Sequence, residues 1–266
     1  MVEQSLRKNN VTVIEKASFD DTIIFAHGFG TDQHAWKDVV PAFENQYRIV
    51  LYDNVGGGMA DAAAFSPNKY DNLYSYADDL LDICKALNIN DAIMVGHSVS
   101  GMISLLAGNK EPGRFRKMVL VGASARYLDD ENYKGGFTQE ALNGLYQAMA
   151  NNYYAWVSGF APAAMANPDN PEFTAGFEQT LSAIRPDIAL SVAKVIFQSD
   201  YRHELPKCTT ETLLLQTKQD IAVPLEAAEY LHNNIRNSRL RVIEAEGHFP
   251  HISAPNEVIT AIKEFI

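Results

Sequence analysis

A serine flanked by small residues follows a short apolar run and precedes a helical pattern. Residues 94–101 read MVGHSVSG, which places Ser98 where a strand turns directly into a helix. Such an elbow holds a serine hydroxyl exposed for attack on an acyl carbon, and it usually reads Gly-x-Ser-x-Gly. Ser100 stands in place of the second glycine, but it is small and Gly101 follows. The segment therefore predicts that Ser98 is a nucleophile.

An acid and a histidine follow this serine in the order that the strand–elbow–helix arrangement requires. Asp220 comes shortly after the apolar run 213–215, and His248 comes shortly after the run 240–243. If both runs are strands of one parallel sheet, the two loops and the elbow meet at the same edge. We predict that His248 is the general base for Ser98 and that Asp220 orients the imidazole.

Three other titratable residues compete for these roles. His251 is the main alternative to His248 as the base, but it lies nearer the start of the last helix. His97 is expected to brace the elbow rather than to take part in the reaction. Asp53, at the end of an earlier apolar run, is expected to be a turn carboxylate.

Acyl transfer also needs hydrogen-bond donors for the negative oxygen that develops during attack. Residues 26–30 read AHGFG and follow the apolar run 23–26, and their glycines allow the backbone to turn its amides inward. We predict that the N–H groups of Phe29 and Val99 form the oxyanion hole. The alternative interpretation is a simple glycine turn.

The elements that must position these loops are visible as short apolar runs separated by helical patterns, which is typical of parallel strands joined by helical crossovers. The run at 11–14 alternates polar and apolar residues and is expected at an edge of the sheet. The pattern predicts an α/β sandwich with a mostly parallel central sheet. The predicted strands are 11–14, 23–26, 49–52, 92–95, 118–121, 213–215 and 240–243, and the predicted helices are 36–43, 74–87, 99–108, 225–233 and 257–266.

The strand pattern stops between residues 126 and 200, where four helical segments replace it. They are expected near 138–149, 155–165, 173–184 and 186–197. We predict that residues 1–125 and 201–266 form the core domain, and that residues 126–200 form a helical cap inserted after the sixth strand. Such a cap would cover the carboxyl edge of the sheet, where open α/β sheets bind ligands.

The composition excludes several classes of partner. The formal net charge of −11 argues against nucleic acids and anionic membranes, which bind Lys/Arg surfaces. No run approaches the roughly 20 apolar residues of a membrane span. The first ten residues lack the apolar centre of a signal peptide, so we expect a cytoplasmic protein. Neither a metal site nor a cofactor is indicated, and the two cysteines, Cys84 and Cys208, are expected to be unreactive.

Longer motifs resemble one branch of the α/β-hydrolases, namely the bacterial stress-response hydrolase RsbQ and the plant strigolactone and karrikin receptors. The resemblance runs from about residue 11 to the end of the chain, and its cap motifs are far more specific than the three polar residues. The motifs are HGFGTDQ at 27–33, GHSV at 96–99, YLDD at 127–130, NYYAWV at 152–157, FAP at 160–162, RPDIA at 185–189, FQSDYR at 197–202 and EGHFPH at 246–251.

This resemblance implies an α/β-hydrolase fold whose four cap helices form a V over a small hydrophobic pocket that leads to the serine. Carried over by matching motif, the substrate-binding residues would be Phe29, Tyr127, Trp156, Phe160 and Phe197. The alternative for each aromatic residue is simple packing within the cap.

The resemblance also implies two kinds of function. The first is hydrolysis of a small, largely apolar ester or lactone through an acyl-enzyme, without metal or cofactor. The alternative is a ligand-sensing role of the RsbQ type, in which the pocket binds a hydrophobic metabolite and the surface engages a regulatory partner protein.

Overall fold

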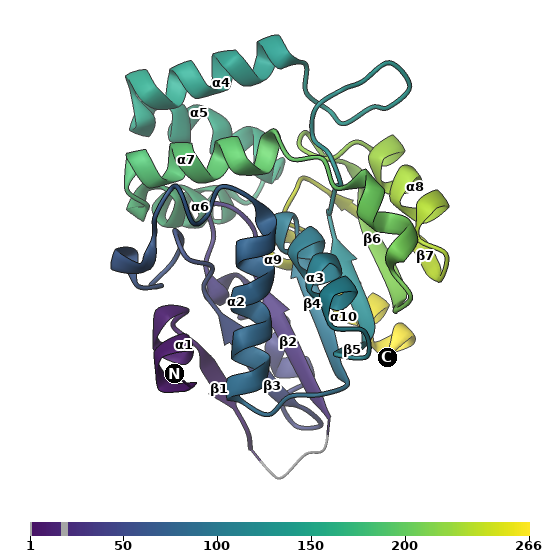
Figure 1. Cartoon of the computed structure of the whole chain (residues 1–266). Coiled ribbons are helices and arrows are strands. Elements are labelled where there is room, and N and C mark those ends of the chain that lie inside the picture. The colour runs from purple at the N-terminus through teal and green to yellow at the C-terminus, as the bar shows by residue number, and fades with distance from the viewer. Residues whose placement is uncertain (1, 17–20) are drawn as a thin grey trace.

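The computed structural model describes residues 2–16 and 21–266, and within them seven strands form one sheet (Figure 1). The strand order is β1-β3-β2-β4-β5-β6-β7, and every pair is parallel except β1 with β3. Each predicted run overlaps a strand, and the alternating first run is at an edge as expected. The strands are β1 Thr12–Ile14, β2 Thr22–Ala26, β3 Arg48–Tyr52, β4 Ala92–His97, β5 Phe115–Val121, β6 Glu211–Gln219 and β7 Ser238–Glu246.

Helices cover both faces of the sheet because successive strand residues point to opposite sides. Ile24 and the strand residues that point to the same side of the sheet pack against α2 (Leu73–Ala86), α3 (Val99–Lys110) and α8 (Leu225–Asn234). Ile23, Phe25 and the strand residues that point to the opposite side pack against α10 (Pro255–Phe265). This helix follows the short α9 (Pro250–Ser253). The two buried clusters fix the sheet between its helices, so the loops at its carboxyl edge have rigid supports.

Four further helices form a layer beyond the carboxyl edge of the sheet, at the top of Figure 1. The loops that follow β2 and β7 are bonded to this layer, since Thr180 Oγ1 donates to the Gly30 carbonyl and His248 N–H donates to the Ala164 carbonyl. The four helices match the four predicted segments, and they are α4 Gln139–Asn151, α5 Tyr153–Met165, α6 Pro171–Ala183 and α7 Pro186–Phe197.

The position of this helical layer in the strand count differs from the prediction. The layer follows β5, the fifth strand, and not a sixth strand. The reason lies in the order of the apolar runs, since only five of the seven predicted strands precede residue 126.

The two ends of the helical insertion meet at a neck. Arg126 pairs with Asp200 as an isolated antiparallel bridge, and Tyr201 N–H donates to the Ala125 carbonyl at 2.8 Å. The guanidinium of Arg126 also lies 2.8 Å from the Asp200 carboxylate, which Arg202 binds as well. The chain therefore leaves and rejoins the core at one point.

Two parts of the core differ from the sequence pattern. The helix expected at 36–43 is wrong, because the segment forms two short 3₁₀ helices, Gln33–Trp36 and Val40–Ala42. Pro41 has no N–H to donate to the preceding turn and its ring crowds that turn, which disfavours a continuous helix over so short a segment. A further helix, α1 (Val2–Lys8), was not predicted and packs against α2.

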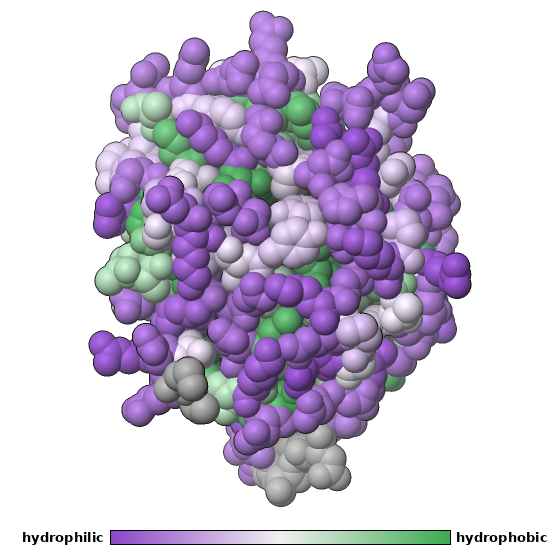
Figure 2. Space-filling model, in the orientation of Figure 1, coloured by the Kyte–Doolittle hydropathy of each residue, from purple (hydrophilic) through white to green (hydrophobic). Residues whose placement is uncertain are grey.

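The surface is dominated by polar side chains. Figure 2 shows a mostly hydrophilic face on which the visible apolar groups are small and separated by polar ones. Among the described residues, no helix combines the length and the apolar character that crossing a membrane requires. Both cysteines are buried, and burial raises the pKa of the Cys84 thiol to about 12. The reactive thiolate of Cys84 is therefore disfavoured.

Candidate functional site

Ser98 occupies a strained turn between β4 and α3. Its backbone has φ 54° and ψ −124°, a positive-φ conformation that a residue with a Cβ adopts only when its surroundings enforce it. Ser98 N–H donates to the Val121 carbonyl of the neighbouring strand at 2.8 Å. The predicted elbow is therefore present, with the serine at its apex.

After Ser98, the position in this elbow that leaves no room for a side chain is Gly101 rather than residue 100. A Cβ on Gly101 would lie 2.6 Å from Cβ of Ala123, which leaves no room for a side chain. Ser100 is buried, and its hydroxyl donates to the His27 carbonyl at 2.5 Å. The departure from Gly-x-Ser-x-Gly is thus compatible with the elbow, because the glycine that the packing requires comes one position later.

Ser98, His248 and Asp220 form a continuous hydrogen-bonded chain. His248 Nε2 lies 2.8 Å from Ser98 Oγ, and His248 Nδ1 lies 2.7 Å from Asp220 Oδ2. The other carboxylate oxygen, Oδ1, accepts the N–H groups of Ala222 and Val223 at 2.7 and 3.1 Å. Asp220 directly follows β6, and His248 lies two residues after β7. The structure thus brings together the three predicted side chains in a geometry that allows proton transfer from serine to imidazole.

The competing base, His251, is placed elsewhere. It is fully buried in α9, packed against Trp36 and His97 at ring-centroid distances of 4.4 and 4.3 Å. In the described part of the chain, neither of its ring nitrogens has a hydrogen-bond partner. Burial lowers the pKa of His251 to about 3, so the ring remains uncharged at neutral pH.

His97 contacts the histidine loop through its ring. Its Nε2 lies 2.7 Å from the carbonyl oxygen of His248, so this nitrogen carries the hydrogen and donates. Burial lowers the pKa of His97 well below its ordinary value. The expected bracing contact is present, and it extends to the loop of His248.

The Asp53 carboxylate accepts hydrogen bonds from two backbone N–H groups and from one side chain. The donors are the N–H groups of Gln33 and Met59 and the side-chain amide of Asn10, at 2.8 to 2.9 Å. These are the contacts of a turn carboxylate, as expected from the sequence.

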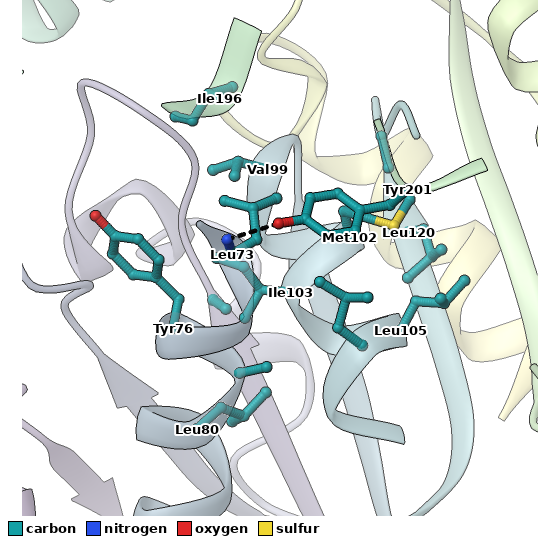
Figure 3. Close-up of a cluster of buried hydrophobic side chains, with 14 of the residues drawn as sticks. Leu73, Tyr76, Leu80, Val99, Met102, Ile103, Leu105, Leu120, Ile196 and Tyr201 are labelled. Atoms are coloured by element: carbon teal, nitrogen blue, oxygen red, sulfur yellow. Dashed lines mark hydrogen bonds between the residues drawn. The ribbon is translucent and has the colours of Figure 1, made fainter. Parts of the chain in front are cut away.

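The two predicted oxyanion donors are free to receive a ligand atom. Val99 is the first residue of α3, where helix N–H groups have no partner within the helix. Across residues 2–16 and 21–266, neither Phe29 N–H nor Val99 N–H donates to another protein group. Figure 3 shows the Val99 side chain among apolar groups of α2, α3 and α7, including Leu73, Ile103 and Ile196. The Val99 N–H lies at the start of α3 and the Phe29 N–H lies in the loop after β2, and their role as the oxyanion hole stays a prediction.

The predicted aromatic residues fall into two groups and one separate residue. Tyr127 and Phe197 pack edge to face at 5.4 Å, and the Tyr127 hydroxyl lies 3.4 Å from Ser98 Oγ. Trp156 and Phe160 stack in α5 at 5.0 Å. Phe29 is separate, beside a small apolar cavity of about 30 Å³, which is room for roughly one or two waters. The other four predicted residues do not line that cavity, so their role as a pocket lining stays a prediction.

Two further aromatic residues connect the layers and were missed by sequence reasoning. Phe177 of α6 lies 6.3 Å from Phe160 and 4.4 Å from Phe249, by ring centroids. Phe249 in turn packs edge to face with His248 at 5.2 Å. Their positions in the sequence could have indicated them. Phe249 directly follows the predicted base, and Phe177 lies within a predicted cap helix.

Comparison with protein families identifies the family to which this fold belongs. Residues 21–161 match the family model described as the alpha/beta hydrolase fold. The chain belongs to the α/β-hydrolase family. Residues 195–266 of this α/β-hydrolase also match a model described as TAP-like protein.

Individual relatives place the chain within the family. It is 43% identical to the karrikin insensitive 2 receptor CA of Petunia hybrida, over 97% of this chain and 95% of that protein. It is 42% identical to the strigolactone esterase D14 of Arabidopsis thaliana, with 94% and 92% covered. A solved structure of a hydrolase from Oleispira antarctica superposes with a TM-score of 0.95 at 30% identity, covering 99% of this chain and 96% of the other. The predicted resemblance to the plant receptors is confirmed.

Proposed function

We propose that this α/β-hydrolase cleaves a small, largely apolar ester or lactone through an acyl-enzyme on Ser98. The observation that carries the proposal is the unbroken contact from Ser98 Oγ through His248 to the Asp220 carboxylate, at 2.8 and 2.7 Å. Family membership and a relative named as an esterase support the reaction class. The aromatic residues on the helical layer support a largely apolar substrate.

The reaction begins when His248 Nε2 takes the Ser98 proton and Oγ bonds to the acyl carbon. The carbonyl oxygen becomes negative and accepts the N–H groups of Phe29 and Val99. Asp220 stabilises the imidazolium without taking its proton. The imidazolium then protonates the leaving alkoxide as the bond to it breaks, which leaves an ester on Ser98. A water then gives a proton to His248 Nε2 as its oxygen bonds to the acyl carbon. The imidazolium returns this proton to Ser98 Oγ as the acyl–Oγ bond breaks, which releases the carboxylic acid and restores the hydroxyl.

The proposal is tested with p-nitrophenyl acetate and a fluorophosphonate probe. The wild-type protein is expected to release p-nitrophenol, and mass spectrometry is expected to place the phosphonyl group on Ser98. Ser98→Ala should abolish both while keeping the thermal unfolding profile. A folded wild-type protein that neither turns over the ester nor reacts with the probe would reject the proposal.

A second candidate function is ligand sensing, in which a bound hydrophobic metabolite alters a surface that a regulatory protein recognises. The specific support is the 43% identity, over nearly the whole chain, to a protein named as a receptor. The two functions are compatible, since a slow hydrolase can report its ligand. Sensing predicts that a lactone bound to Ser98→Ala changes amide hydrogen exchange in α4 to α7. Exchange that stays unchanged at saturating lactone would count against it.

A further inference from the structure

The peptide that joins Gly28 to Phe29 is held by its oxygen atom. The Gly28 carbonyl is contacted by His27 Nδ1 at 2.8 Å, by Thr31 Oγ1 at 3.1 Å and by Thr31 N–H at 3.4 Å. In a planar trans peptide the C=O and N–H groups point in opposite directions. Fixing the Gly28 oxygen therefore fixes the direction of the Phe29 N–H, which is one of the two proposed oxyanion donors.

The hydrogen position on His27 follows from its other ring nitrogen. The backbone N–H of Asn54 donates to His27 Nε2 at 3.0 Å, so Nε2 must be the acceptor. The ring hydrogen then lies on Nδ1 and is donated to the Gly28 carbonyl. Asp53 Oδ1 lies 3.8 Å from Nε2, too far for a hydrogen bond, and it accepts the Gln33 N–H at 2.8 Å. The tautomer of His27 is thereby set by the loop after β3.

The backbone carbonyl of His27 is held as well. Ser100 Oγ donates to it at 2.5 Å, and Asn54 Nδ2 donates to it at 3.2 Å and to Ser100 Oγ at 3.0 Å. His27 and Ser100 are buried, at 2% and 0% exposure. Ser100 lies in the first turn of α3, next to Val99. One hydrogen-bonded unit thus joins the loop of Phe29 to the helix start that carries the second proposed donor.

We propose that His27 and Ser100 are positioning residues that hold the two oxyanion donors in register. The inference rests on the proposed hydrolysis, because it assigns a support to the site where the negative oxygen forms. His27 orients and polarises the Gly28–Phe29 peptide through Nδ1, and Ser100 ties residue 27 to the start of α3. A glycine at position 100 could not make this tie, which gives the departure from the usual elbow sequence a function.

The first experiment removes and restores the Ser100 hydroxyl. Ser100→Ala is expected to lower kcat for p-nitrophenyl acetate on the order of 10- to 100-fold with KM within about twofold, since a misplaced donor retains part of its effect. Ser100→Thr keeps a hydroxyl and should recover most of the rate. The matched control is Ser104→Ala, which removes a buried hydroxyl one turn later on the same helix, where it bonds the Ser100 carbonyl. This control should keep wild-type kcat.

His27 provides an independent pair of variants. His27→Leu removes the donor to the Gly28 carbonyl, whereas His27→Asn places an amide N–H near the position of Nδ1. The leucine variant should lose activity as Ser100→Ala does, and the asparagine variant should regain part of it. Because His248 is unaltered, the pH dependence of kcat should keep its midpoint in all these variants.

Binding of phenylboronic acid separates the inference from the proposed function. The boronate forms a tetrahedral, negatively charged adduct with an activated serine, and calorimetry detects it without any turnover. Its dissociation constant should rise in Ser100→Ala by the same factor by which kcat/KM falls, and should stay unchanged in Ser104→Ala. Wild-type protein that binds the boronate without turning over the ester would reject hydrolysis but still allow this test. Equal affinity in wild type and Ser100→Ala, or no wild-type adduct, would overturn the inference.

Discussion

The backbone N–H of His248 donates a 2.8 Å hydrogen bond to the carbonyl oxygen of Ala164, in the last turn of α5. The last four carbonyls of a helix have no partner within it, so the loop of the proposed base satisfies one of them. A second contact holds the preceding residue of the loop, because Thr217 Oγ1 of β6 donates to the Gly247 carbonyl at 2.9 Å. The helical layer and β6 thus set the position of the His248 backbone together.

Gly247→Ala tests this arrangement. Gly247 has φ +84°, and a Cβ there would lie 2.1 Å from the Met165 carbonyl oxygen. The substitution should lower the free energy of unfolding by about 2 kcal/mol, as overpacking does, and should also lower kcat because the loop must move away from α5. Urea unfolding and p-nitrophenyl acetate turnover measure the two effects.

Gly144→Ala is the matched control in α4, where an added Cβ meets nothing within 4 Å. It should stabilise the protein by about 0.5–1 kcal/mol through helix propensity and leave kcat unchanged. Both variants are compared with the same parent protein. A Gly247→Ala protein that matched the parent in both measurements would contradict the coupling.

Asp220→Asn tests the orientation of the base. The amide can keep its oxygen against the N–H groups of Ala222 and Val223, which places its NH₂ group against His248 Nδ1. That nitrogen must then accept, so the ring hydrogen moves to Nε2 and faces Ser98 as a donor. We expect kcat to fall by roughly 10⁴, the loss measured for this substitution in a serine protease, with little change in thermal unfolding. Activity within tenfold of wild type would show that Asp220 does not set the tautomer.

His251→Phe tests a pH dependence of stability. Burial lowers the pKa of His251 to about 3, whereas an unfolded chain takes up this proton near pH 6.5. As the pH falls through this window the unfolded state binds the proton and the folded state does not, so stability is lost. Between pH 7.5 and 5, wild type should lose about 2 kcal/mol more than His251→Phe in urea unfolding. Equal losses in the two proteins would contradict the assignment.

Gly101→Ala tests the close contact in the elbow. The added methyl group would meet the Ala123 side chain at 2.6 Å, and overpacking of this kind costs about 1–3 kcal/mol. Ala123→Gly in the same chain removes the opposing group and should recover part of the loss. A double-mutant cycle from chemical unfolding gives the coupling between the two positions. Additive effects would mean that the two positions are not in repulsive contact.

The sequence was sufficient for the strands and for the three polar residues, because each follows an apolar run whose carboxyl end must lie at one edge. It was insufficient where a contact depends on another segment. Residues 216 and 217 are polar yet buried within β6, because Gln216 donates to the Val223 carbonyl and Thr217 to the Gly247 carbonyl. The hydropathy pattern therefore predicts a strand that ends at residue 215, whereas β6 continues to Gln219.

The role of His27 could not be read from its loop. The neighbouring glycines indicate only a turn of the backbone. The contacts that hold the His27 ring and carbonyl include hydrogen bonds from Asn54 and Ser100, which are 27 and 73 residues away. The single helix expected at 36–43 does not form for a local reason, since Pro41 interrupts a segment whose spacing is otherwise amphipathic. Long-range hydrogen bonds and one proline thus account for these differences.

The neck formed by Arg126 and Asp200 has a consequence for how such a protein can diversify. Because Tyr201 N–H bonds to the Ala125 carbonyl, the segment between them begins and ends at adjacent points. A replacement segment of different length or shape could be spliced in there without rerouting any strand. Such an exchange would keep the strands and loops that carry Ser98 and Asp220, but the new segment would have to replace the Ala164 carbonyl that accepts the His248 N–H.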